Sequence, residues 1–327
     1  MLAIRLFIRT ALAGLALLAP VAPAAQIDYP ARPIRLLVPF PPGGGADTLA
    51  RIVTPRLTDG MGQTWVVDNR GGAAGNLATE IVATAQPDGY SVLLGFNTAL
   101  AVNPTLYPRL PFNVLRDLQP VTKLAAAQYI LVVHPAVQAA TLSEFIALAK
   151  ALPGKLNYSS AGVGSPLHLA AEMFKLRAGV DLVHVPYKGG GPAAAALLGG
   201  EVQVLFGSVA STLPQVKAGK LRAFAVTGLK RSAVAPQLPT IAESGFPGFE
   251  VASWYSLLVP AKTPRAIVKR IYDEALRAVR LPDVQEALGR QGLEVETSAS
   301  PEEFATQLKA ETAAWEKVIK TAGIRAE

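Results

Sequence analysis

Short runs of β-branched and other apolar residues alternate with longer stretches of helical periodicity along most of the chain. This alternation is typical of α/β proteins with largely parallel sheets. Helices are predicted between the apolar runs. The runs themselves predict strands at residues 34–38, 65–68, 92–95, 129–133, 156–159, 182–185, 202–206, 223–226 and 255–259.

Recognisable start and stop signals mark several of the predicted helices. Thr141 opens a capping box, and Ser165 is the expected N-cap of a helix that Gly179 ends. Ser300 repeats this start before a final helix that reaches about residue 322. Pro55 falls inside the first helical stretch, where its missing N–H should kink or shorten the helix.

A glycine-rich turn at residues 39–47 connects the first strand to the first helix. Gly43, Gly44 and Gly45 allow the backbone to approach a ligand, while Phe40 offers a ring face and Asp47 is the expected N-cap. A strand that turns into a helix leaves free N–H groups at the positive end of the helix dipole. We therefore expect an anion site here, with a tight connection that binds nothing as the alternative.

A second turn of the same kind follows the strand at residues 156–159. Gly162 and Gly164 supply N–H donors, and Ser160 and Ser165 supply hydroxyls, although an N-cap role would partly commit Ser165. The turn is not a P-loop, because the chain contains neither GxxxxGK[ST] nor a GxGxxG that opens a helix. Together the two turns predict two lobes that close over a small anion.

No enzymatic constellation is evident in the sequence. His134, His168 and His184 lack the spacing of a metal site, and no GxSxG elbow supports Ser160 or Ser165 as a nucleophile. His168 could donate to an anion or serve as a structural cap partner. An exported hydrolase remains an alternative, but we expect no catalysis, cofactor or metal.

The first 25 residues have the pattern of a secretory signal peptide. Arg5 and Arg9 precede a short apolar core at residues 10–18, and small residues at 22–24 suit a cleavage site. An uncleaved anchor is the alternative. Because the chain contains no cysteine, neither a lipid anchor nor a disulfide is possible, and we expect a freely soluble periplasmic protein.

Length and charge indicate a two-lobed protein with an acidic ligand. The chain of 327 residues exceeds what one compact core usually holds, and its net charge of +7 falls by two with the signal peptide. No basic stripe is present, so nucleic acid is not an expected partner. The predicted division is a signal peptide at 1–25, a first lobe at 26–124 and 252–327, and a second lobe at 125–251.

Many short motifs, in one order, resemble the solute-binding receptors of tripartite tricarboxylate transporters, known as Bug proteins. The resemblance spans the whole mature chain. Its motifs include residues 29–34, 39–47, 67–71, 86–90, 103–104, 156–165, 168–170, 184–189, 219–222, 239–240, 254 and 301–304.

The resemblance implies a periplasmic-binding-protein type II fold that holds a carboxylate in the cleft between its lobes. Typical ligands are di- and tricarboxylates, acidic amino acids and aromatic carboxylates, which the receptor, expected to be a monomer, delivers to a two-subunit membrane permease. Docking on a periplasmic sensor protein for signalling is the alternative. The implied ligand-binding residues are Phe40, Gly43, Gly44, Gly45, Asp47, Asn97, Thr98, Ser160, Ala161, Gly162, Gly164, Ser165 and Ser208.

Two departures from the family pattern bear on ligand choice. Gly207 and Ala196 stand where similar proteins commonly have an Asp, and Ser208 replaces an Asn. If position 207 faces the cleft, the chain lacks a carboxylate that could pair with a ligand amine. We therefore expect a plain organic acid rather than an amino acid.

Overall fold

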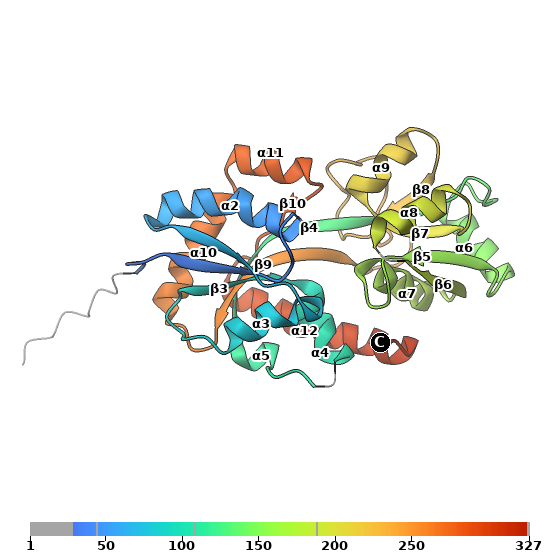
Figure 1. Ribbon diagram of the computed structural model, residues 1–327. Helices are drawn as coiled ribbons and strands as arrows, with labels where there is room; N and C mark the ends of the chain where they lie inside the picture. Colours follow the sequence, from blue (N-terminus) through green and yellow to red (C-terminus); the bar gives the residue numbers. More distant parts are fainter. Residues whose placement is uncertain (1–28, 44, 108, 188, 326–327) are drawn as a thin grey trace, which may run out of the picture.

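The computed structural model describes residues 29–43, 45–107, 109–187 and 189–325. The predicted signal peptide and Gly44 of the first turn lie outside the described residues. Figure 1 shows two α/β lobes joined by two extended strands, β4 and β9. Within the described ranges, no helix combines the length and the apolar character needed to cross a bilayer.

The first lobe is built on a sheet in which β1 pairs in parallel with both β2 and β3, and β9 pairs antiparallel with β3. The second lobe is built on parallel β5, β6 and β7. The strands of the first sheet are β1 (Ile34–Val38), β2 (Trp65–Asn69), β3 (Ser91–Phe96), β9 (Ala252–Pro260) and β10 (Glu294–Val295). Those of the second are β5 (Leu156–Ser160), β6 (Leu182–Pro186), β7 (Val204–Ser208) and β8 (Arg222–Val226).

The long strand β4 (Leu118–Val133) belongs to both sheets. Its first part pairs antiparallel with β9 and β10, and its last five residues pair with β7 and β8. All nine predicted strands are present, but the predicted run at 129–133 is only the end of β4. The earlier part was missed because Lys123 and other polar residues interrupt its apolar pattern, and pairing with β9 makes it a strand.

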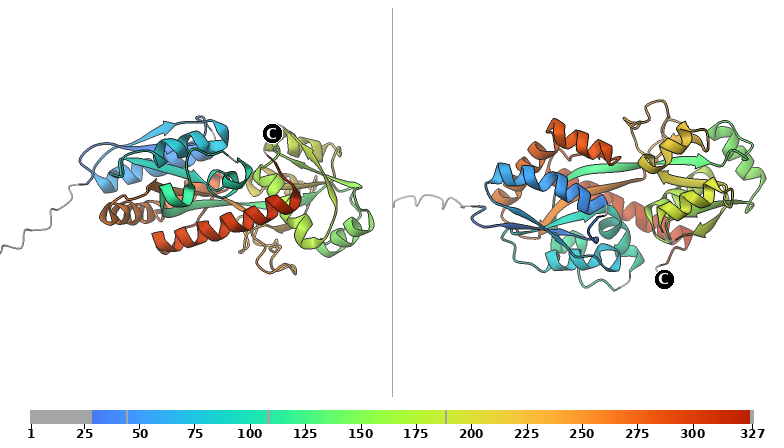
Figure 2. Two further views of the ribbon diagram at one scale, coloured as in Figure 1. Left: turned by 90° about the horizontal axis from the view of Figure 1, so that it is seen from below. Right: turned by 45° about the horizontal axis from the view of Figure 1, so that its top comes forward.

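Helices cover both sheets (Figure 1). The helical segments of the first lobe are α2 (Gly45–Met61), η1 (Ala73–Gly75), α3 (Asn76–Ala83), η2 (Thr98–Val102), α4 (Asn103–Leu106), α5 (Val114–Asp117), α10 (Arg265–Val279) and α11 (Pro282–Arg290). Those of the second are α6 (Leu142–Ala151), α7 (Pro166–Ala178), α8 (Gly190–Leu198) and α9 (Val209–Lys217). The last helix, α12 (Pro301–Ala322), runs along one side of the molecule from the first lobe toward the second (Figure 2).

The predicted caps at Thr141, Ser165 and Ser300 are confirmed, since each side chain accepts a hydrogen bond from the backbone N–H three residues later. The first helix differs from its prediction at its start, since α2 begins at Gly45 rather than after Asp47. Pro55 does not shorten it, because the helix continues to Met61.

The largest hydrophobic cluster crosses the junction between the lobes. It extends from Leu37 in β1 through Tyr129 in β4 to Phe206 in β7, and it includes Trp254 of β9 and Trp315 of α12. Two smaller clusters lie within single lobes, one under α2 and α10 and the other under α8 and α9. The junction between the lobes is therefore packed where this cluster lies, and β4 is held by residues of both lobes.

Gly95 in β3 tests how tightly the first lobe is packed. A Cβ at this position would lie 2.4 Å from Leu258 Cδ1 and 2.6 Å from Leu100 Cδ1, and both leucines are fully buried. We expect Gly95→Ala to lower the free energy of unfolding by about 1–3 kcal/mol through overpacking. Urea denaturation measures this change.

Gly289→Ala in α11 is the matched control. A Cβ there meets no atom within 4 Å. Because alanine suits a helix interior better than glycine, we expect a gain of about 0.5–1 kcal/mol. Equal effects of the two substitutions would contradict the packing described for β3.

Candidate functional site

The carboxyl ends of the parallel strands in the two lobes face each other across a short stretch of β4. The end of β3 at Phe96 pairs with Tyr255, which pairs with Ala125 of β4. The end of β7 at Ser208 pairs with Tyr129 of β4. Since β3 runs parallel to β4 and β7 runs antiparallel to it, the two ends point toward each other. Four residues of strand separate them, a distance of about 13 Å, and ligands of open α/β sheets bind at such strand ends.

The first turn is held from behind by Asp47. Its buried carboxylate accepts hydrogen bonds from the Gly43 N–H at 2.9 Å, Arg51 Nε at 3.0 Å and Asn69 Nδ2 at 3.1 Å. The hydrogen bond from Arg51, followed by that from Gly43, lowers the pKa of Asp47, so its carboxylate is ionised at neutral pH. Asp47 therefore buttresses the turn, and its place on the ligand wall stays a prediction.

An aromatic row lies beside this turn. The Phe40 and Phe96 rings meet edge to face at 5.4 Å, and Phe96 lies 5.3 Å from the Tyr255 ring. The Tyr255 hydroxyl would lie 3.2 Å from a Cβ at Gly45, so it reaches the N-terminus of α2. Burial raises the pKa of Tyr255 to about 12, which keeps its hydroxyl protonated as a donor.

Sequence reasoning placed Phe40 and Gly45 at the site but missed Tyr255. Its hydroxyl makes no hydrogen bond to a described residue, and neither do the N–H groups of Gly45 and Ala46. Gly43 adopts a left-handed φ of 88°, which favours glycine at this position. The one sequence signal for Tyr255 is a polar aromatic residue at the start of an otherwise apolar predicted strand.

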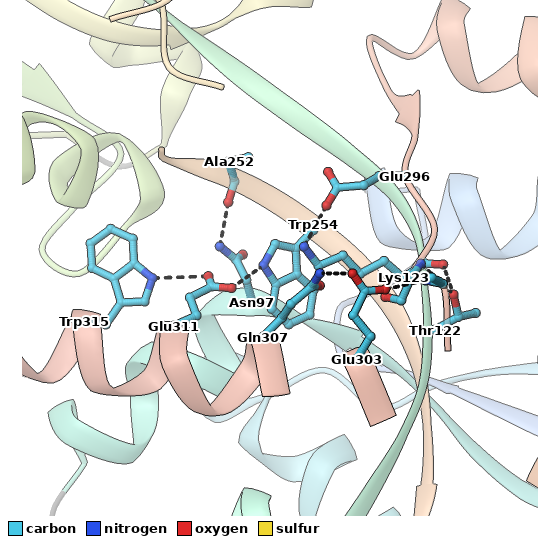
Figure 3. A network of polar contacts seen from close by, with 12 residues as sticks. Asn97, Thr122, Lys123, Ala252, Trp254, Glu296, Glu303, Gln307, Glu311 and Trp315 are labelled. Atoms are coloured by element: carbon cyan, nitrogen blue, oxygen red, sulfur yellow. Dashed lines mark hydrogen bonds and ion pairs between the residues drawn. The ribbon is translucent and has the colours of Figure 1, made fainter. Parts of the chain in front are cut away.

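The third loop, which follows β3, contributes Asn97 and Thr98. Asn97 Nδ2 donates to the Ala252 carbonyl at 2.8 Å, where β9 begins. Its Oδ1 and the Thr98 Oγ1 are buried without a hydrogen-bond partner among the described residues. The amide nitrogen of Asn97 is therefore committed to the junction between the lobes (Figure 3). The Thr98 hydroxyl is buried in this structure, and its contact with a ligand stays a prediction.

In the second turn, most of the predicted polar groups hydrogen-bond within the turn itself. Ser160 is fully buried, and its hydroxyl contacts His184 Nε2 at 2.6 Å and both the N–H and the carbonyl of Gly162 at 3.1 Å. The Gly164 N–H donates to His168 Nδ1 at 3.0 Å, and Ser165 caps α7. The Ser160 hydroxyl is therefore engaged by His184 and Gly162, and its contact with a ligand stays a prediction.

What the second turn offers to a ligand is backbone. Ala161 and Gly162 are half-buried, and the N–H groups of Ala161 and Val163 make no hydrogen bond to a described residue. Gly162 has a φ of 117°, a conformation that side-chain-bearing residues rarely adopt. These N–H groups precede α7, whose dipole places partial positive charge at the same point.

A stack of buried polar rings supports this turn from beneath. The His168 and His184 rings lie 4.1 Å apart, and Tyr158 stacks on His184 at 4.9 Å. The Tyr158 hydroxyl donates to Glu172 Oε1 at 2.6 Å. Burial, with the neighbouring His184, lowers the pKa of His168 to about 4. His168 is therefore neutral and accepts from Gly164, which supports the structural alternative rather than anion binding.

Ser208 lies at the N-terminus of α9, opposite the first lobe. Its Oγ accepts from the Ser211 N–H at 3.3 Å and lies 2.6 Å from the Ser211 Oγ. At Gly207, a Cβ would lie 2.2 Å from Thr212 Oγ1, so the position faces the protein rather than the cleft. Ala196 is buried in a hydrophobic cluster. Gly207 and Ala196 therefore give no reason to exclude amino-acid ligands.

Within the part of the chain that the structure describes, no group of three or more His, Asp or Glu side chains is arranged to hold a metal ion. The candidate site instead offers N–H groups at the starts of α2 and α7, the Tyr255 hydroxyl and aromatic rings. Such an arrangement stabilises a small anion. The Ser160 hydroxyl lies 2.6 Å from His184 Nε2, but Ser160 is fully buried.

Residues 49–324 match the family model described as the tripartite tricarboxylate transporter family receptor. Protein BugT of Bordetella pertussis is 37% identical over 305 residues, which cover 93% of each chain.

Three solved structures share the fold. An R. palustris protein with adipate is 36% identical with a TM-score of 0.74, and it covers 91% of this chain and 99% of its own. MatC from Rhodopseudomonas palustris with bound malate is 31% identical with a TM-score of 0.70, covering 89% and 100%. A TctC solute-binding protein from Polaromonas without ligand is 30% identical with a TM-score of 0.82, covering 90% and 99%. The expected α/β periplasmic-binding-protein fold is confirmed by these matches.

The buried His168 makes stability depend on pH. Its folded pKa of about 4 lies below the ordinary value of 6.5, so the unfolded chain binds more protons between these values. Stability is thus full above pH 6.5 and falls as the pH drops toward 4, by up to roughly 3 kcal/mol. His168→Asn keeps an acceptor for the Gly164 N–H but cannot titrate, so we expect it to lose less stability between pH 7 and pH 5.

Urea denaturation of both proteins at the two pH values measures the difference. Burial also lowers the pKa of His184, which acts in the same direction and remains in the variant, so some pH dependence should persist. Identical losses in the wild type and in His168→Asn would show that His168 is not held neutral beneath the second turn.

Proposed function

Because the chain belongs to the tripartite tricarboxylate transporter receptor family, we propose that it captures a small organic carboxylate in the periplasm and delivers it to a two-subunit membrane permease. Receptors of this family bind solutes and are not enzymes, and this chain is a solute-binding receptor. The ligand class, the compartment and the permease are what we propose beyond family membership.

One observation carries the proposal: two turns whose N–H groups make no hydrogen bond to a described residue lie at facing strand ends. The N–H groups of Gly45 and Ala46 begin α2, and those of Ala161 and Val163 precede α7. Converging N–H donors at helix N-termini favour anions, and the attraction grows when closure removes water. A carboxylate matches these donors in charge and size. The bound adipate and malate of two relatives support this class.

We further propose that residues 26–124 and 252–327 move as one lobe and residues 125–251 as the other. The two connections would then be β4 and the start of β9, where Asn97 holds Ala252.

We also propose that residues 1–25 are a signal peptide that directs export of the protein. The support is the basic start at Arg5 and Arg9, the short apolar core and the small residues before position 25. Without a cysteine the mature protein carries no lipid at its N-terminus. A receptor of this kind would diffuse between its ligand and the permease.

A thermal-shift screen of the mature protein against organic acids tests the ligand class. The panel contains adipate, malate, glutamate, benzoate and a neutral diol of matched length. A ligand at 100 times its Kd stabilises the folded state by about 2.7 kcal/mol. We expect at least one acid to raise the Tm and the diol to have no effect. Unchanged Tm values with every acid, after native mass spectrometry has excluded a co-purified ligand, would refute the proposal.

Tyr255→Phe should weaken binding of the best acid about tenfold without changing the fold. The hydroxyl is placed to donate to an anion, and a hydrogen bond to a charged group contributes about 1.5–3 kcal/mol. Isothermal titration calorimetry gives the Kd. Tyr272→Phe is the matched control, since that hydroxyl donates to the Ser298 and Ala299 carbonyls behind α10. Equal affinities in the wild type and in Tyr255→Phe would remove the hydroxyl from the site.

Gly162→Val should abolish binding. Valine strongly disfavours the φ of 117° and would place a branched side chain beside the free N–H groups of the second turn. Because a Cβ at this position lies 3.7 Å from its nearest neighbour, the Tyr187 carbonyl, we expect the protein to remain folded by circular dichroism. Retained affinity would mean that the second turn does not contact the ligand.

A further inference from the structure

A side chain of the neighbouring strand reaches into the first turn. Asn69 is the last residue of β2, and in the parallel pairing with β1 it lies level with Val38, the last residue of that strand. It shares a face of β2 with Trp65 and Val67, which belong to the hydrophobic cluster under α2. The Asn69 side chain therefore lies where β1 ends and residues 39–47 lead into α2.

The amide group of Asn69 holds both ends of this turn. Its Nδ2 donates to the Phe40 carbonyl at 3.0 Å and to Asp47 Oδ1 at 3.1 Å, so the two acceptors match the two N–H donors of one amide. The other oxygen of Asp47 accepts from the Gly43 N–H at 2.9 Å. Asn69 is thus linked directly to Phe40 and Asp47, and through Asp47 to Gly43.

The charged side chains nearby do not replace this amide. Arg51 is the other side chain that donates to Asp47, but it reaches Oδ2, and 58% of its side chain is exposed. Arg35 and Arg70 pair with Asp68. Because alternate residues of a strand point to opposite faces, this second cluster lies on the other face of β2. Among the described residues, Asp47 Oδ1 therefore accepts from the amide alone.

We propose that Asn69 is a positioning residue for ligand binding: without contacting the ligand, it sets the conformation of the first turn through Phe40 and Asp47. The Phe40 ring and the N–H groups at the start of α2 are the parts of this turn that lie at the candidate site. Both follow the backbone between residues 40 and 47, which the amide holds at its two ends. The consequence for affinity rests on the proposed function, whereas the conformational role does not.

Hydrogen exchange of backbone amides, followed by NMR, tests the conformational role in the mature protein without a ligand. The Gly43 N–H is the reporter, since it donates to Asp47, and we expect Asn69→Ala to lower its protection factor at least tenfold. The Gly164 N–H of the second turn, which donates to His168, is the reference and should keep its protection. Wild-type protection of Gly43 in the variant, or an equal loss at Gly164, would overturn the proposal.

Asn69→Asp keeps the shape of the side chain, removes both donors, and serves also if Asn69→Ala does not fold. Two carboxylates then face each other, and their like charges raise the pKa of one of them, so a proton taken up as the pH falls restores a donor to Asp47. Relative to wild type at the same pH, the Gly43 protection factor should be at least tenfold lower at pH 8 and recover at least threefold by pH 5.5. A general loosening of the fold would not recover in this way, and a constant ratio would contradict the assignment.

Isothermal titration calorimetry tests the consequence for the ligand. The probes are adipate, malate, glutamate and benzoate, and any that binds the wild type should bind Asn69→Ala at least fivefold more weakly. Asp68→Asn is the matched control, since Asp68 precedes Asn69 on β2 but pairs with Arg35 and Arg70. Unchanged affinity in Asn69→Ala, or an equal loss in Asp68→Asn, would overturn the positioning role. If no probe binds the wild type, the proposed function fails, and the exchange of Gly43 still decides the role of Asn69.

Discussion

The antiparallel pairing of β4 with strands of both lobes is the constraint on which the rest of the structure depends. One end of β4 is fixed in register with β9 and the other with β7. This pairing sets the direction in which the strand ends of each lobe point and the length of chain between them. The turns at residues 39–45 and 160–165 can face each other only because one strand carries both registers. The candidate site is therefore a property of the junction as much as of either lobe.

Side chains hold the turns in place, and the backbone is left for the ligand. Asp47 secures the first turn through Gly43, and His168 secures the second through Gly164. Both side chains are buried, and each accepts a hydrogen bond from an N–H group of its turn, which fixes the orientation of that N–H group. The remaining N–H groups then converge from two directions. Backbone donors of fixed geometry recognise a carboxylate group. Neighbouring side chains such as Phe40 and Tyr255 then determine which ligand fits beyond that group.

Local sequence determined much of this protein, including most strands of the two sheets, the caps at Thr141, Ser165 and Ser300, and the two glycine turns. These features follow from periodicity, capping and φ preferences, which act over a few residues. Tertiary structure alone decided the rest. It extended β4 through a polar stretch by pairing it with β9, turned the Ser160 hydroxyl inward to His184, and brought Tyr255 to Gly45 from 210 positions along the chain. No local signal encodes these outcomes, because each depends on partners that only folding brings within hydrogen-bond distance.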